Sequence, residues 1–261
     1  MAKYRQQRGG TILYDTIKTA SRLTKRVLVG ISGGKDSTVV LDLCTRFFKE
    51  VVGFSMYTPC RLEFMEKTLR FYEKQYGIEI VRVPHYCVSD KLRYGIYRNP
   101  DLSVPLLEET DVLNYVREQT DTWWIAGGER ATDNLVRNAM IKGSGTIDAK
   151  RGRIFVIAYW HADEVLHYIK MRKLKTSPEF RYLGHSLGGL DAFNMAPLKE
   201  YFPADYERIC ACYPYVEVST KREEFFDFYN VGRVKIKEAI KQRMSEQNEV
   251  KDDGVRAEKD E

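Results

Sequence analysis

Gly30-Ile31-Ser32-Gly33-Gly34-Lys35-Asp36-Ser37-Thr38 is the stretch on which the fold of this chain depends. An apolar run, RVLVGI at residues 26–31, leads into it and is typical of a buried parallel strand. The residues that follow, DSTVVLDLCTRFF at 36–48, have the apolar spacing of a helix. A loop between a strand and a helix gathers backbone N–H groups at the positive end of the helix dipole. We therefore predict a site for phosphate, pyrophosphate or sulfate, which Gly33 and Gly34 allow to approach the backbone closely.

Segments with strand and helix patterns keep alternating beyond this stretch. Further strands are expected at 51–57, 78–83, 122–128 and 153–159, and further helices at 61–77, 111–119 and 162–174. This alternation predicts an α/β fold with a doubly wound, mostly parallel sheet.

Composition narrows the class of protein. No apolar run approaches the roughly 18 residues that span a bilayer, and the N-terminus lacks the apolar stretch of a secretory signal. The expected location is therefore the cytoplasm, with no membrane partner. The segment 245–261 holds seven acidic and three basic residues, a net charge of −4. Because the whole chain has a net charge of +5, the remaining residues carry about +9. Such a body favours anionic ligands.

Five cysteines are scattered through the chain without a CxxC pair. In a cytoplasmic protein this pattern predicts thiols, and neither a zinc ribbon nor an iron–sulfur cluster is expected. The one close pair is Cys210 and Cys212.

Two well-known phosphate loops are excluded by counting residues. A Walker A loop has four residues between its glycines and a Ser or Thr after its lysine. Here three residues separate Gly30 from Gly34, and Asp36 follows Lys35. The dinucleotide fingerprint GxGxxG is missing as well.

The segment SGGKDS at 32–37 instead resembles the signature of the PP-loop ATP pyrophosphatase superfamily. Three further segments resemble one branch of it, the phosphoadenosine phosphosulfate (PAPS) reductase family. They are GGERATDNLVR at 127–137, the second strand–helix–strand unit at 57–83, and the segment from Trp160 to Leu174, whose expected role is structural. The resemblance covers roughly residues 25–215 and implies a fold like that of the adenine nucleotide α-hydrolases.

The resemblance implies a set of nucleotide-binding residues. The β,γ-phosphates of ATP, or the sulfo-phosphate group of PAPS, would be held by Ser32, Gly33, Gly34, Lys35, Asp36 and Ser37. Gly128, Arg130 and Arg137 would bind another phosphate or the second substrate. Lys35, Asp36 and Arg130 are the expected catalytic residues, with Lys35 neutralising developing charge. Asp36 would either orient Mg²⁺ or cap its helix, and the sequence leaves these two roles open.

Spacing adds a geometric expectation for the two arginines. Arg130 and Arg137 are seven residues apart, so on one helix they would share a face. Asp133 is their expected ion-pair partner. Guanidinium groups suit tetrahedral oxyanions better than ammonium groups do.

The resemblance fails at the C-terminus. The family's Glu-Cys-Gly-(Leu/Ile)-His motif, whose thiolate attacks sulfur, does not occur after Cys212. Cys210 and Cys212 are the candidate redox pair that could replace it, although the helical pattern around them predicts that Cys210 is buried. We therefore expect nucleotide activation or sulfur transfer. A genuine PAPS reductase that uses Cys210 and Cys212 stays open.

A class without catalysis also stays open. It would be a nucleotide-binding regulator or a component of a nucleic-acid modification system, although no nucleic-acid-binding motif is visible. A second copy of the chain is a further candidate partner. Four segments are expected: an N-terminal helix at 1–24, the PP-loop nucleotide-binding α/β domain at 25–215, an amphipathic helix at 216–244 and a disordered charged tail at 245–261.

Overall fold

A computed structural model describes residues 11–183, 187 and 189–225 of the chain. The chain divides into two compact units at Ser177 and Pro178. This division falls inside the segment 25–215, and the domain boundaries predicted from the sequence stay a prediction. No helix in the described ranges is long and apolar enough to cross a membrane.

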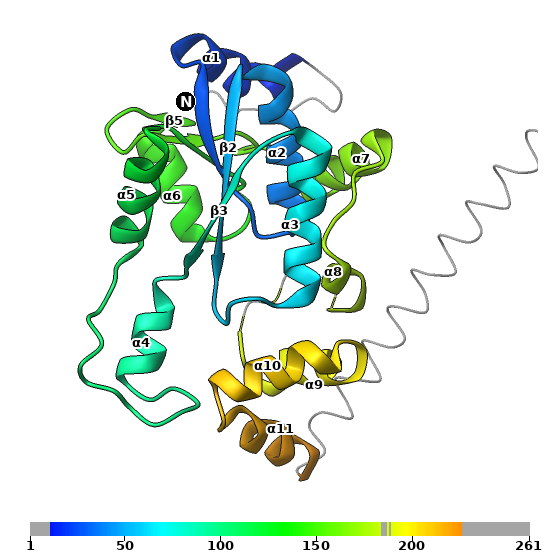
Figure 1. The fold of residues 1–261 in the computed structure, drawn as a ribbon. Coiled ribbons are helices and arrows are strands. Elements are labelled where there is room, and N and C mark those ends of the chain that lie inside the picture. Colours follow the sequence, from blue (N-terminus) through cyan, green and yellow to red (C-terminus); the bar gives the residue numbers. More distant parts are fainter. Residues whose placement is uncertain (1–10, 184–186, 188, 226–261) are drawn as a thin grey trace, which may run out of the picture. The chain divides into compact units, whose positions relative to one another are not determined.

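A six-stranded sheet forms the centre of the first unit (Figure 1). Its strands are β1 (Arg26–Gly30), β2 (Glu50–Tyr57), β3 (Ile80–Pro84), β4 (Ile125–Gly127), β5 (Ile147–Asp148) and β6 (Arg153–Phe155), in the order β3-β2-β1-β4-β6-β5. Every neighbouring pair is parallel except β5 and β6. The doubly wound, mostly parallel α/β fold is therefore confirmed, and its strand order reverses between β1 and β4.

The helices of the first unit lie between and around these strands. They are the 3₁₀ helix η1 (Thr11–Tyr14) and the α-helices α1 (Asp15–Leu23), α2 (Lys35–Phe47), α3 (Glu63–Tyr76), α4 (Cys87–Arg93), α5 (Glu109–Thr120), α6 (Leu135–Ser144) and α7 (Ala162–Arg172). α4 lies in the segment 84–105, for which the sequence predicted a less regular insert.

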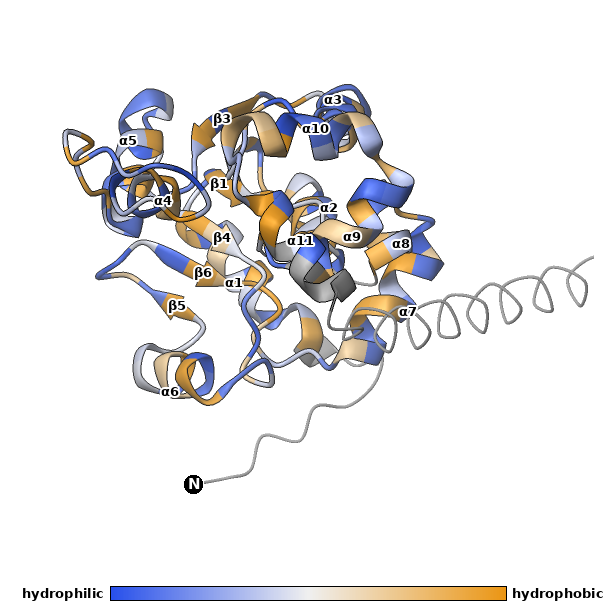
Figure 2. Ribbon diagram, turned by 90° about the horizontal axis from the view of Figure 1, so that it is seen from below, coloured by the Kyte–Doolittle hydropathy of each residue, from blue (hydrophilic) through white to orange (hydrophobic). Residues whose placement is uncertain are grey.

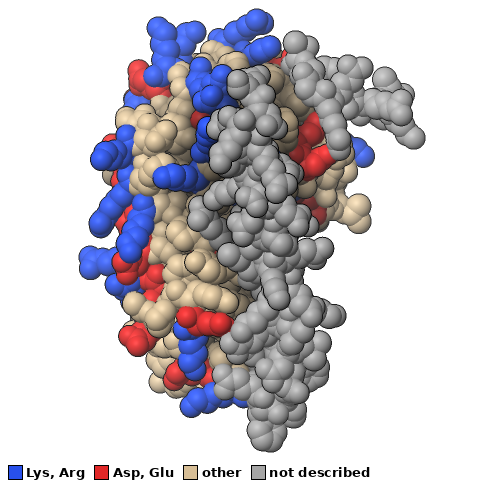
Figure 3. Space-filling model, turned by 90° about the vertical axis from the view of Figure 1, so that its right-hand side faces the viewer, with Lys and Arg blue, Asp and Glu red and all other residues tan. Residues whose placement is uncertain are grey.

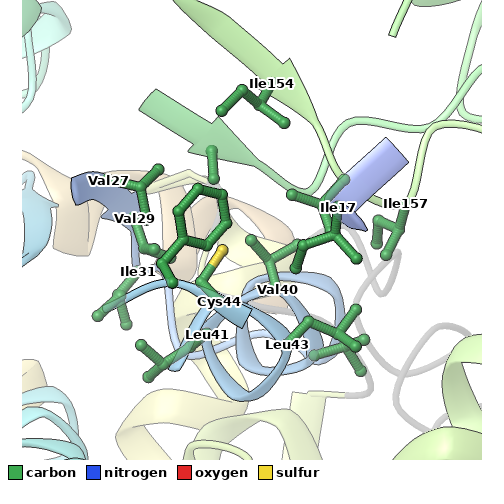
Figure 4. Packing of buried hydrophobic residues seen from close by; sticks show 14 of the residues in the cluster. Ile17, Val27, Val29, Ile31, Val40, Leu41, Leu43, Cys44, Ile154 and Ile157 are labelled. Atoms are coloured by element: carbon green, nitrogen blue, oxygen red, sulfur yellow. The ribbon is translucent and has the colours of Figure 1, made fainter. Parts of the chain in front are cut away.

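β1 is buried on both faces, as its continuous apolar sequence predicted. Val27 and Val29 belong to a cluster with apolar residues of α1, α2 and α7, part of which is drawn in Figure 4. Leu28 belongs to a separate cluster with Val112 and Val116 of α5. Because side chains alternate along a strand, β1 packs against helices on both faces. Figure 2 shows the hydrophobic character of the central strands.

The apolar run at 153–159 is only partly a strand. β6 ends at Phe155, and the chain then turns, with the N–H of Ala158 donating to the carbonyl of Phe155 at 3.1 Å. Val156 and Ile157 are nevertheless buried. The residues after Phe155 are apolar because they are buried, and they do not pair with a neighbouring strand. The short strand β5 in front of it was not predicted.

The second unit is helical in its described part. It holds α8 (Pro178–Leu183), α9 (Ala192–Tyr201), α10 (Pro203–Cys212) and α11 (Val216–Phe225). Its buried apolar side chains include Met195, Leu198, Ile209, Tyr213 and Val216. The predicted helix at 216–244 is present as far as Phe225, and the remainder of it, with the tail at 245–261, lies outside the described residues.

Candidate functional site

The segment 30–38 lies at the point where the strand order reverses. β1 pairs with β2 on one side and with β4 on the other, and all three run parallel. The loop after β1 and the loop after β4 therefore emerge at the same edge of the sheet. In open α/β sheets, ligands bind at such a point, outside the carboxyl ends of the strands.

The loop after β1 ends at the N-terminus of α2. Gly34 is the N-cap residue of this helix in an extended conformation, and no side chain of the described part of the chain caps it. The Ser37 hydroxyl donates to the carbonyl of Gly34 at 3.1 Å and lies 3.2 Å from the Ser32 hydroxyl. The backbone N–H of Ser32 donates to the Ser37 hydroxyl at 3.3 Å. An uncapped helix N-terminus with two adjacent hydroxyls is suited to an oxyanion.

Gly33 is hydrogen-bonded to the segment that follows α7. Its φ is +74°, and its carbonyl accepts from the N–H of Ser177 at 3.0 Å. A Cβ at this position would lie 2.8 Å from the Cβ of Ser177. The Ser177 hydroxyl in turn accepts from Thr68 of α3 at 3.1 Å. The loop thus has a fixed shape that depends on a residue far away in the sequence.

A second contact joins the same segment to the first turn of α2. The hydroxyl of Tyr72 donates to the carbonyl of Lys175 at 2.8 Å and lies 2.9 Å from the hydroxyl of Thr38. Tyr72 and Thr38 are both buried. Sequence reasoning missed Tyr72 and Ser177 as supports of the loop, because a single Tyr or Ser carries no local signal for such a contact.

Four of the predicted site residues are linked through carboxylates. Asp36 is 2.6 Å from the Lys35 ammonium and 3.3 Å from Nε of Arg130. Asp133 is 2.8 Å from Arg130 and 2.6 Å from Arg137. The structure therefore brings Lys35, Asp36, Arg130 and Arg137 together beside the loop.

Asp133 is the centre of the arginine pair. Burial alone would raise the pKa of this carboxyl, but hydrogen bonds from the Arg130 backbone N–H and the Arg137 side chain, with both arginine charges, lower the pKa below its ordinary value. Asp133 thus holds both guanidinium groups as a carboxylate. The predicted ion-pair role of this residue is confirmed.

The expectation that Arg130 and Arg137 share a helix face is wrong. Arg130 lies in the loop after β4, whereas Arg137 is in α6, whose N-cap Asn134 accepts from the Arg137 backbone N–H at 2.8 Å. Arg130 is 7% exposed, and its Nη1 has no hydrogen-bond partner among the described residues. A buried guanidinium N–H without an acceptor is costly and marks a place for a ligand oxygen. Gly128 allows the loop after β4 to pack closely against the first turn of α2, since a Cβ there would lie 3.2 Å from the backbone carbon and the Cβ of Asp36.

A pocket of about 350 Å³ opens beside the loop. Its apolar lining includes Phe54, Met56, Leu113 and Ile125, and its lining near the loop includes Ser32, Asp36, Ser37, Gly127 and Gly128. The remaining polar lining consists of His85, Glu109, Glu129, Arg137 and Arg153. Pockets of this size with an apolar wall and a few polar groups are typical of small-molecule sites.

Sequence reasoning did not single out His85, Glu109, Glu129 or Arg153. His85 follows directly after β3 and Glu129 directly follows the Gly127-Gly128 loop, so the rule that ligands bind at carboxyl ends of strands could have found both. Glu109 and Arg153 come from the start of α5 and the start of β6, and no local pattern marks them. Burial, and then the nearby Lys91 charge, lower the pKa of His85, with Glu109 opposing them.

The candidate redox pair lies elsewhere. Cys210 and Cys212 are at the end of α10 in the second unit, and Cys210 is partly exposed, not buried as expected. Burial is nevertheless the main cause that raises the pKa of the Cys210 thiol, while a hydrogen bond with Tyr206 opposes it. A raised pKa disfavours the thiolate that a nucleophilic cysteine needs.

Comparisons with known proteins place the chain in a wider context. The family model described as the phosphoadenosine phosphosulfate reductase domain matches residues 26–192. No curated protein matches the sequence.

Three solved structures are among those similar to the chain. The U34-tRNA thiolase NcsA from Methanococcus maripaludis with its 4Fe-4S cluster is 20% identical over 77% of this chain and 78% of that chain, with a TM-score of 0.43. The NH3-dependent NAD synthetase from Campylobacter jejuni in complex with nitrate is 16% identical over 82% and 93%, with a TM-score of 0.42. The PAPS reductase from Candida auris in a phosphate complex is 12% identical over 64% and 83%, with a TM-score of 0.47.

The expectation of no iron–sulfur cluster is contradicted by one of these structures, the thiolase. It was drawn from the missing CxxC pairs, yet the similar thiolase is described with a 4Fe-4S cluster. Within residues 11–183, 187 and 189–225, no group of three or more His, Cys, Asp or Glu side chains is placed to hold a metal ion.

Proposed function

The chain belongs to the phosphoadenosine phosphosulfate reductase domain family, and from this premise we propose that it is an enzyme that binds an adenine nucleotide at the loop Ser32–Ser37. The phosphates lie against the N-terminus of α2, and the base lies against the apolar wall of the adjoining pocket. The observation that carries the proposal is the buried Arg130, whose unpartnered guanidinium nitrogen lies in the same charge network as Lys35 and Asp36.

The reaction that these residues support best is nucleotide activation. An acceptor oxygen attacks the α-phosphate, the bond to the β-phosphate breaks, and pyrophosphate leaves. Lys35 and Arg130 stabilise the negative charge that develops on the phosphate oxygens, and the fixed loop holds the leaving group in place. Asp36 positions both cations through its two carboxylate oxygens.

Reduction of a sulfonucleotide is less well supported. It needs a thiolate, and the pKa of Cys210 is raised, not lowered. We therefore place the chain with the activating enzymes of its superfamily.

Calorimetric titration with ATP tests the proposal directly. Lys35→Ala is expected to weaken ATP binding at least tenfold, about 1.4 kcal/mol, because it removes the charge beside the loop. Lys74→Ala removes an exposed lysine from α3 and is the matched control, with affinity expected to stay within twofold. Equal affinities of the wild type and Lys35→Ala would contradict the proposal, provided that both proteins unfold at the same temperature.

A further inference from the structure

The pocket beside the loop has an excess of negative charge, although the body of the protein is basic. Three carboxylates line it, from Asp36, Glu109 and Glu129, against two guanidinium groups, from Arg137 and Arg153. Burial, as the largest cause, lowers the pKa of His85, so this imidazole is neutral at neutral pH. Asp36 is paired with Lys35 and Arg130. The excess of carboxylates in the lining is therefore at Glu109 and Glu129, which share the single guanidinium of Arg153.

Both arginines of the lining already have carboxylate partners. Arg153 is paired with Glu129 and lies 3.3 Å from Glu109. Arg137 is 2.6 Å from Asp133. A phosphate group that entered this part of the pocket would have to displace a carboxylate from one of these arginines.

Glu129 also has a carboxylate oxygen without a hydrogen-bond donor among the described residues. Its Oε2 is buried and has no hydrogen-bond partner in the described part of the chain. The carboxylate folds back over the end of β4, where a Cβ on Gly127 would lie 1.9 Å from Oε2. Glycine at 127 thus creates the space that this carboxylate occupies, and Arg153 holds it there. An unsatisfied carboxylate oxygen is an acceptor for a hydroxyl group.

The order of groups in a nucleotide decides which part meets these carboxylates. In the nucleotide pose proposed above, the phosphates bind the loop and the base packs on Phe54, Met56 and Leu113. The ribose then lies between them, in the pocket that Glu109 and Glu129 also line. Carboxylates that accept from ribose hydroxyls are a common means of sugar recognition in nucleotide-binding α/β folds.

We propose that Glu109 and Glu129, held by Arg153, make this site specific for adenine nucleotides with free ribose hydroxyls and exclude 3′-phosphorylated ones. The inference rests on the proposed function, and it names the substrate class of the same site: ATP or a related 5′-nucleotide, not PAPS. A 3′-phosphate would bring about two further negative charges next to two carboxylates, whereas a 3′-hydroxyl donates to the orphaned oxygen of Glu129.

Two matched ligand pairs test this on the full-length wild-type chain by calorimetry. AMP and adenosine 3′,5′-bisphosphate differ only in the 3′-phosphate, and AMP is expected to bind at least tenfold more tightly. ATP and 3′-deoxy-ATP differ only in the 3′-hydroxyl, and the deoxy compound is expected to bind several-fold more weakly. Binding of the bisphosphate as tight as that of AMP overturns the inference.

Variants then assign the effect to the two carboxylates. In the double variant Glu109→Gln, Glu129→Gln, the preference for AMP over the bisphosphate is expected to fall about tenfold. Glu118→Gln removes an exposed carboxylate from α5 and is the matched control, with the preference unchanged. An unchanged preference in a double variant that unfolds like the wild type overturns the assignment.

Lys35→Ala separates this inference from the proposal beneath it. Weaker binding of every nucleotide by Lys35→Ala, together with tight bisphosphate binding by the wild type, leaves the proposed site standing and removes only the specificity. No effect of Lys35→Ala on any nucleotide removes the site, and the specificity with it.

Discussion

At the residue scale, Gly33 shows how a single position links the loop to the rest of the unit. Its φ of +74° is in the left-handed region, where residues with a Cβ are strained. Its neighbour Ser177 leaves no room for a Cβ either. Gly77 has a similar φ of +63°, but nothing lies within 4 Å of the Cβ it lacks. The two glycines therefore separate the effect of backbone conformation from the effect of crowding.

Gly33→Ala is expected to destabilise the protein by more than Gly77→Ala and to weaken ATP binding. Both substitutions cost about 1–2 kcal/mol for the left-handed conformation. Only Gly33→Ala adds a clash, which shifts either the loop or Ser177. Urea unfolding and calorimetric titration measure the two effects. Weaker ATP binding by Gly77→Ala, or none by Gly33→Ala, would contradict this account of the loop.

The carboxyl of Asp133 makes the stability of the protein depend on pH. Hydrogen bonds from Arg130 and Arg137 outweigh burial and lower the pKa of Asp133 in the folded protein. In the unfolded chain this carboxyl regains an ordinary pKa near 3.9. Its contribution to stability is therefore present above that ordinary pKa and is lost as the pH falls through it towards the lower folded pKa.

We expect Asp133→Asn to reduce the loss of stability on acidification. As the pH falls through the ordinary pKa, near 3.9, the wild type progressively loses the contribution of Asp133, whereas an Asn at this position has no proton to take up. Urea unfolding of both proteins at several pH values from 7 to 3 gives the two slopes. Other carboxyls with lowered pKa values, such as Glu73, contribute equally to both proteins and cancel in the difference. Identical slopes would show that Asp133 is not held as described.

At the element scale, a buried carboxylate joins three helices behind the loop. Asp42 of α2 is 3% exposed and accepts from Tyr168 of α7 at 2.7 Å and from Tyr76 of α3 at 3.4 Å. Arg172 of α7 lies 3.3 Å from the same carboxylate. Burial and the contact with Asp42 raise the pKa of Tyr168, so its hydroxyl keeps the proton that it donates. This cluster fixes α2, and with it the helix N-terminus at the site.

Asp42→Ala is expected to lower the free energy of unfolding by about 3 kcal/mol, because it leaves the buried hydroxyl of Tyr168 and the partly buried hydroxyl of Tyr76 without their acceptor. Tyr168→Phe removes one donor and is expected to cost about 1 kcal/mol. Since the two residues share a hydrogen bond, the double variant should lose less than the sum of the single losses, by about 1 kcal/mol. Chemical denaturation of the four proteins completes the cycle. Additive losses would mean that the bond between Asp42 and Tyr168 contributes nothing.

At the scale of the whole molecule, the described strands and all the residues that line the pocket belong to the first unit. Ser177, which supports Gly33, is its last residue. The hydrophobic clusters on the two faces of the sheet lie in the same unit. A compact unit with its own core can fold without its neighbour.

A fragment of residues 1–177 is accordingly expected to fold and to bind ATP with an affinity within about threefold of the full chain, on the usual scale of tenfold per 1.4 kcal/mol. Circular dichroism and thermal unfolding report its folding, and calorimetry reports its affinity. The fragment carrying Lys35→Ala is the control for binding at the loop. A folded fragment with more than tenfold weaker binding would show that the second unit contributes to the site.

The charge of the whole chain differs in sign from the balance of charged side chains in the pocket. Lys and Arg side chains gather along the left edge of the face shown in Figure 3, in keeping with the basic body read from the sequence. The pocket itself has more carboxylates than guanidinium groups. The net charge of the chain predicts an anionic ligand, and this stays a prediction. It gave no information about the carboxylates of Glu109 and Glu129 in the pocket.

The fold and the loop between β1 and α2 were predictable because their signals are local. A buried parallel strand, a glycine loop and a helix follow one another within residues 26–47, and the alternation continues in the same way along the first unit. The spacing of Arg130 and Arg137 led to a wrong prediction, because residues seven apart share a face only if both lie in the same helix. Here α6 begins at Leu135, after Arg130. The strand predicted at 153–159 was too long, because β6 ends at Phe155. Buried residues outside a strand have the same apolar pattern as those within one.

The sequence by itself thus determined the family, the α/β fold and the residues of the loop, since each depends on neighbours along the chain. Only the tertiary structure decided what supports and surrounds that loop. Ser177 reaches Gly33 across more than 140 positions, and the pocket gathers Glu109, Glu129 and Arg153 from three separate elements. Contacts of this kind leave no pattern in a single sequence, because they are set by the order of the strands and by the edge of the sheet at which their loops meet.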